Sequence, residues 1–183
     1  MKKTALSIIS IMLCLAVIFG FSSCAKSVEM TEENIAETVQ VVETALKEFD
    51  TKTLKKYVDS ETLGVIIPFA EKKEAFCTLG RAMFGNLEME IVSVDAQKGT
   101  VTVEVINKDL YLDASDFAYN LNRDYSKMQL LGKLEDDSFI NDNLNPLIEK
   151  IDAAPMQSEK QQITLTVTQG KRNLVLSFDE TAE

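Results

Sequence analysis

Two stretches of alternating apolar and polar residues constrain the fold of this chain more than any other feature. In residues 87–106, apolar side chains recur at every second position on both sides of a turn at Asp95 to Gly99. Residues 163–178 repeat the pattern around a turn at Gly170. A period of two is typical of a strand with one buried face. Each stretch therefore predicts a β-hairpin whose apolar face needs a cover.

Helical spacing precedes the first hairpin. Apolar residues recur at steps of three and four from Ile35 to Phe49, and Thr31 in front of them is a typical N-cap residue. Asp50 or Thr51 is expected to cap a second, short helix. Residues 59–67 are expected to form a short buried segment, and a third helix is expected from about Phe69.

The connection between the hairpins is also periodic. Residues 113–134 and 138–151 have helical spacing, with Pro146 expected in a first turn or at a kink. The pattern predicts an α+β fold in which N-terminal helices pack on a curved antiparallel sheet of two hairpins, with a helical insertion between the hairpins. One domain is expected over residues 31–179, followed by an acidic tail at 180–183.

The N-terminus has the three parts of an export signal. Lys2 and Lys3 precede an apolar run over residues 5–21, and Phe21-Ser22-Ser23-Cys24 follows. This tetrapeptide resembles the lipobox of bacterial lipoproteins. The resemblance implies a signal peptide over residues 1–23, acyl chains such as palmitate on Cys24, and a tether over residues 24–30. The protein would then be exported and lipid-anchored on the outer face of the cell membrane.

Two other readings of this segment stay open. Small residues at Ser23 and Ala25 also fit a conventional cleavage after Ala25, which would release a soluble secreted protein. The 17-residue apolar run is also close to the lower limit of about 17–25 residues for an uncleaved membrane anchor.

The charge of the chain bears on its partners. Loss of residues 1–23 removes Lys2 and Lys3 and changes the net charge from −10 to −12. Such a surface repels nucleic acid and anionic lipid headgroups. Attachment to the membrane would therefore depend on the acyl chains of Cys24.

Composition also excludes common catalytic chemistry. The chain has no histidine, and Cys77 would be the one free thiol of the mature protein, so ordinary zinc and haem sites are excluded. Cys77 is expected to be a buried, inert thiol. The oxygen-rich segments 135–137 and 141–145 raise the question of calcium, but they lack the glycine of an EF-hand loop and are read as helix caps. No metal or cofactor is therefore expected.

The chain as a whole resembles the nuclear-transport-factor-2-like (cystatin-like) fold. The resemblance is carried by the opening helix at residues 35–49, the step Phe49-Asp50-Thr-Lys-Thr-Leu54-Lys-Lys-Tyr57 into the next helix, and the later strand pairs. It implies a cone-shaped antiparallel sheet curled around one long and two shorter helices. Small Gram-positive lipoproteins of unknown function are similar to it too.

Enzymes on this fold often use an aspartate or tyrosine inside the cone. Asp59 and Asp113 are read as helix caps, so no catalytic residue is assigned. Four aromatic residues are the candidates for lining a ligand cavity: Tyr57, Tyr111, Phe117 and Tyr119.

The leading hypothesis is a non-catalytic binding module for a small apolar ligand or an envelope component. One alternative is an isomerase- or hydrolase-like enzyme that uses a buried carboxylate in the same cavity. Another is a structural protein that forms a homodimer through the outer sheet face, where Val92, Val94 and Ile106 lie among glutamates.

Overall fold

Helices and one sheet make up the structure. The computed structural model describes residues 27–178, so the predicted signal peptide 1–23, Cys24 and the tail 180–183 lie outside the described residues. The elements are α2 (Glu32–Glu48), α3 (Thr51–Tyr57), β1 (Val58–Asp59), α4 (Glu61–Ala70), α5 (Glu74–Phe84), β2 (Glu88–Asp95), β3 (Thr100–Ile106), α6 (Tyr111–Asp124), α7 (Lys127–Lys133), α8 (Asp137–Ala153), β4 (Gln161–Gln169) and β5 (Leu174–Ser177). The predicted α+β class is confirmed.

The strands form one open sheet in the order β1-β5-β4-β3-β2. Both predicted hairpins are present, as β2–β3 and β4–β5, and β3 pairs antiparallel with β4. The prediction of a purely antiparallel sheet is wrong, because β1 pairs parallel with β5. With only Val58 and Asp59, β1 is too short for an alternating pattern to appear in the sequence.

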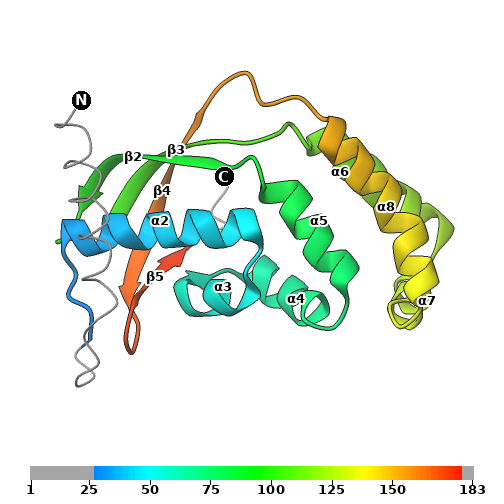
Figure 1. Cartoon of the computed structure of the whole chain (residues 1–183), viewed down its shortest axis with the longest axis horizontal. Helices are drawn as coiled ribbons and strands as arrows, with labels where there is room; N and C mark the ends of the chain where they lie inside the picture. The colour runs from blue at the N-terminus through cyan, green and yellow to red at the C-terminus, as the bar shows by residue number, and fades with distance from the viewer. Residues whose placement is uncertain (1–26, 179–183) are drawn as a thin grey trace, which may run out of the picture.

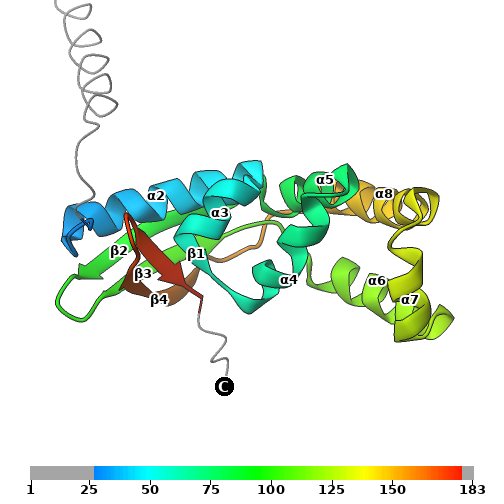
Figure 2. The ribbon, with the colours of Figure 1, turned by 90° about the horizontal axis from the view of Figure 1, so that it is seen from below.

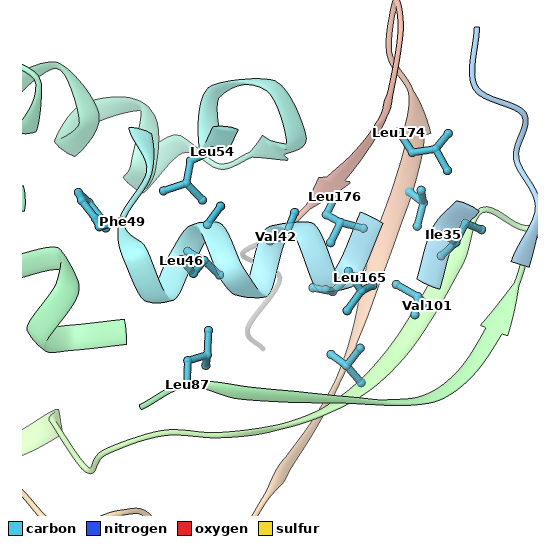
Figure 3. Close-up of a cluster of buried hydrophobic side chains, with 14 of the residues drawn as sticks. Ile35, Val42, Leu46, Phe49, Leu54, Leu87, Val101, Leu165, Leu174 and Leu176 are labelled. Carbon is cyan, nitrogen blue, oxygen red and sulfur yellow. The ribbon is translucent and has the colours of Figure 1, made fainter. Parts of the chain in front are cut away.

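Helix α2 lies across one face of the sheet (Figure 1). The Thr31 hydroxyl accepts a hydrogen bond from the backbone N–H of Asn34 and begins the helix as predicted. The predicted apolar stripe is buried against the sheet, where each large side chain contributes about 1.5–3 kcal/mol of hydrophobic stabilisation. Figure 3 shows this core, which includes Ile35, Val42, Leu46, Val101, Leu165, Leu174 and Leu176.

A β-bulge in β2 changes which residues face this core. The register between β2 and β3 shifts between Ile91 and Ser93, which leaves Val92 as the extra residue. Val92 is therefore exposed, while Val94 packs against the core. The assignment of Val94 to the outer face assumed an unbroken alternation and is wrong, because one extra residue moves every later side chain to the other face.

Two predictions in the next region are wrong. Residues 59–67 were expected to form a short buried segment and a third helix to start near Phe69, but residues 61–70 form one helix, α4, and the next helix, α5, starts at Glu74. Ser60 caps α4, its hydroxyl accepting from the N–H of Leu63, and the helix runs through Pro68 to Ala70. Ile67 and Ala70 point inward at helical spacing, whereas Pro68 is exposed two residues before the helix ends. The run of β-branched residues before Pro68 hid this periodicity.

The insertion between the hairpins forms three helices at one end of the molecule, α6, α7 and α8 (Figures 1 and 2); we call them the arm. The predicted helix 113–134 is two helices, because Ser126 forms a capping box with Gln129 and starts α7. Pro146 lies in the middle of α8 on its exposed side, not in its first turn. The arm contacts the rest of the chain mainly through α8, which packs on α5.

Candidate functional site

An apolar cavity of about 350 Å³ lies between α2, α4, α5 and the sheet. Its size falls within the range of about 300–1,000 Å³ that small-molecule sites occupy. The cavity is lined by Leu46, Phe49, Ser60, Thr62, Leu63, Ile66, Phe76, Leu79, Gly80, Met83, Phe84, Leu87, Met89, Val105, Ile163 and Phe178.

Phe49 forms one wall through an unusual backbone conformation. Its φ of 50° and ψ of 45° place it in the left-handed region, where it ends α2. The next residue, Asp50, donates its N–H to the carbonyl of Ala45 at 2.8 Å, which closes the end of the helix. The Phe49 ring is thereby turned inward and stacks on Phe84, with ring centroids 6.3 Å apart and an interplanar angle of 5°.

Gly80 makes room for this ring. It lies in the middle of α5, and a Cβ atom at this position would overlap with the ring carbons of Phe49. The close approach of the ring to the α5 backbone therefore requires glycine. Phe49 packs on Gly80 and Phe84 of α5, and these three residues form one wall of the cavity.

The cavity has little polar character. Ser60 and Thr62 are the lining residues with polar side chains, and the Ser60 hydroxyl is engaged at the N-terminus of α4. Among residues 27–178, no aspartate, glutamate, lysine, arginine or tyrosine lines it. This lining can bind an apolar molecule by excluding water, and it offers no acid–base group to a bound molecule.

Carboxylates with shifted pKa values lie elsewhere. Hydrogen bonds lower the pKa of several carboxyl groups, none of which belongs to the cavity lining. The groups and the largest cause of each lowered pKa are Asp50 (the Thr53 hydroxyl), Glu90 (the Lys160 ammonium), Asp95 (the Lys98 backbone N–H) and Asp124 (the Arg123 guanidinium).

The four aromatic candidates from the sequence lie outside this cavity. Tyr57 on α3 borders a separate cavity of about 120 Å³ beside Asn173. Phe117 borders one of about 160 Å³ between α6 and α8, while Tyr111 and Tyr119 are exposed on α6. The structure thus brings Tyr111, Phe117 and Tyr119 onto one helix and places Tyr57 apart from them.

The acidic segment at the start of α8 acts as a helix cap. Asp136 accepts hydrogen bonds from the N–H groups of Ser138 and Phe139, which confirms the capping interpretation for this residue. Asp137 pairs with Lys73 at 2.6 Å. Within residues 27–178, no three acidic or cysteine side chains are close enough to hold a metal ion.

The sequence also drew attention to Asp59, Asp113 and Cys77. The predictions of Asp59 and Asp113 as helix caps are both wrong. Ser60 is the N-cap of α4, and Leu110 is the N-cap of α6, so that Asp113 lies inside the first turn of that helix. The half-buried Cys77 thiol donates to the carbonyl of Ala70 at 3.2 Å. Burial, and secondarily the charge of Glu74, raises the pKa of Cys77, which keeps the thiol protonated.

A larger hollow follows the outer side of α2. It has a volume of about 870 Å³, is open to solvent and is lined by acidic and small residues, among them Glu33, Glu37 and Glu48. Because it is a shallow groove along one exposed helix face, it would leave most of a bound molecule in water. The smaller apolar cavity is the better candidate site.

Sequence reasoning found part of the cavity. The spacing of Phe76, Leu79 and Met83 predicted one apolar face of a helix, and these residues line the cavity from α5. The contribution of α4, through Leu63 and Ile66, was missed because the helix itself was not predicted.

Comparisons with known proteins add no family to this description. No protein-family model, curated protein or solved structure matches the chain.

Within residues 27–178, no helix combines the length and apolar content needed to cross a membrane.

Proposed function

We propose that this protein is an exported, lipid-anchored binding module that holds a small apolar ligand in the cavity between α4, α5 and the sheet. In this proposal the acyl chains on Cys24 attach it to the outer face of the membrane, and its fold is a variant of the nuclear-transport-factor-2-like fold. One observation carries the ligand-binding part: the cavity is open and its lining is almost wholly apolar.

The chemistry of the lining defines the ligand class. A hydrocarbon chain or ring system gains about 25 cal/mol for each Å² of apolar surface removed from water. A charged or strongly polar group inside the cavity would lose its hydrogen bonds to water without replacement. The ligand is therefore an apolar molecule, or one whose polar group stays outside the cavity.

The proposal can be tested with the fluorescent fatty acid cis-parinaric acid and a chain beginning after Ala25. Ile163→Trp fills the cavity from β4, and we expect it to weaken probe binding at least about tenfold, or 1.4 kcal/mol. Val92→Trp on the outer face of β2 is the matched control, since it adds the same side chain away from the cavity.

Thermal melting of each variant separates loss of the site from loss of the fold. Probe binding that is absent from the unmodified chain, or that Ile163→Trp leaves unchanged, would contradict the proposal.

A further inference from the structure

The arm carries an unpartnered apolar surface. Neither α6 nor α7 contains a fully buried side chain. Large apolar residues on these two helices are between 60% and 78% exposed: Tyr111, Leu112, Tyr119, Met128 and Leu131. A concentration of large exposed apolar residues on neighbouring helices is typical of a protein interface.

The exposed side of α6 has an ordered charge pattern. Leu112, Ser115, Asp116, Tyr119 and Arg123 recur at steps of one, three and four, so they share one face of the helix. Asp116 lies one turn before Tyr119, and Arg123 lies one turn after it. The opposite side of α6, with Phe117 and Leu121, faces α8.

This pattern is self-complementary. If two copies of α6 lie antiparallel with Tyr119 on the axis, residue 122 of one copy is level with Asp116 of the other. Arg123 then lies about 1.5 Å, one helical rise, from the level of Asp116 and within reach of its carboxylate. Arg123 is exposed and pairs with the neighbouring, also exposed Asp124 at 2.7 Å, so its guanidinium can reach a second carboxylate. Two-fold symmetric interfaces require this kind of reciprocal match.

The exposed apolar area also bears on a dimer. The five exposed side chains, two of which are Met128 and Leu131 on α7, present roughly 600 Å² on each copy, below the roughly 800 Å² per partner of a standard interface. An interface of that size therefore includes α7 beside the α6 pair. The arm lies at the opposite end of the molecule from the start of α2, where the chain leads toward Cys24 (Figure 1). This position favours a protein partner over the anchoring membrane.

We propose that the protein forms a two-fold symmetric homodimer in which α6 pairs antiparallel with α6 of a second copy, with the axis at Tyr119. The alternative dimer through the outer sheet face uses different residues. The arm dimer does not involve the apolar cavity, so it stands or fails independently of ligand binding.

Cysteine cross-linking of the full chain in cells tests the register. In the antiparallel pair, residue 115 lies near residue 122 of the other copy, whereas two copies of residue 115 are about 12 Å apart along the axis and two copies of residue 122 about 9 Å. Disulfides need Cα atoms closer than about 7 Å. We therefore expect a covalent dimer when Ser115→Cys and Asn122→Cys chains with different tags are co-expressed, and none from either variant alone.

Charge reversal tests the proposed contacts. Asp116→Arg in both chains places two arginines opposite each other, and we expect it to lower the cross-linked fraction at least about fivefold. Asp116→Arg combined with Arg123→Asp exchanges the two charges and should restore cross-linking.

Three results would overturn this dimer. They are a mixed pair that does not cross-link, a homodimer formed instead by Val92→Cys on the outer sheet face, and cross-linking of Ser115→Cys to another envelope protein in place of a second copy.

Discussion

Phe49 is held in a backbone conformation that bulky residues rarely adopt. Left-handed backbone usually ends a helix at glycine or asparagine, and a non-glycine residue there carries a cost of order 1 kcal/mol. Burial of the ring against Phe84 and Gly80 offsets this cost. One residue thus ends α2, turns the chain toward α3 and forms a wall of the cavity.

Gly80→Ala should destabilise the protein by about 1–3 kcal/mol. The added methyl group would displace the Phe49 ring, which is held by its backbone and by Phe84. Gly64→Ala in α4 is the matched control, because nothing lies within 4 Å of its Cβ position and alanine favours a helix by up to about 1 kcal/mol. Urea denaturation of both variants checks this, and equal effects would contradict the role assigned to Gly80.

Asp50 makes α3 sensitive to acid. The Thr53 hydroxyl, together with the N–H groups of Thr53 and Lys52, lowers the pKa of Asp50 in the folded chain. Because this pKa is lower in the folded state, the carboxylate stabilises the fold above its unfolded pKa of about 3.9, and this stabilisation is lost as pH falls through the folded value.

Asp50→Ala should therefore cost about 1 kcal/mol near neutral pH, and its cost should shrink as pH falls below about 4. Denaturation curves of the variant and the unmodified protein, recorded near neutral pH and below about pH 4, measure this difference in the free energy of unfolding. A cost that stays constant with pH would show that the charge on Asp50 has no part in the cap.

At the scale of elements, sequence periodicity was a good guide where an element is long and has one buried face. Helix α2 and strands β3 and β4 follow from it, because their inward positions recur without interruption along the element. It failed where one residue changes the pattern: Val92 shifts the alternation of β2, and Pro68 suggested a helix start inside α4.

The bulge in β2 can be tested by a pair of substitutions. Val94→Asp should cost about 2 kcal/mol, because Val94 is partly buried against the core and a carboxylate there would lose part of its hydration. Val92→Asp should change the free energy of unfolding by less than about 0.5 kcal/mol, because Val92 is exposed. An unbroken alternation would predict equal, small effects for both substitutions.

At the scale of the whole molecule, the chain divides its apolar residues between two places. The main core lies between α2 and the sheet, and a second group on α8, including Ile140, Leu144 and Leu147, is buried where α8 packs on α5 and α6. A polar contact also holds the arm. The Lys108 ammonium donates hydrogen bonds to the backbone carbonyls of Ile151 and Asp152 at the end of α8.

The cavity could not be predicted from the sequence because it exists only where these parts meet. Its lining comes from α2, α4, α5 and three strands, far apart in the chain. Periodicity predicts which side chains are buried, but it does not predict whether the space between them is filled. The four aromatic candidates rest on residue type and on the fold resemblance, and neither gives the tertiary position of a single side chain.

The sheet order has a consequence for the timing of synthesis. Among the described strands, β1 lies at the edge of the sheet and pairs with β5 alone, and Leu174 and Leu176 of β5 are fully buried under α2. As the chain leaves the ribosome, the apolar stripe of α2 is made first, and this part of its cover is made more than a hundred residues later. The chain therefore cannot complete its sheet until residues 174–177 have been made, and until then the apolar stripe of α2 lacks this part of its cover.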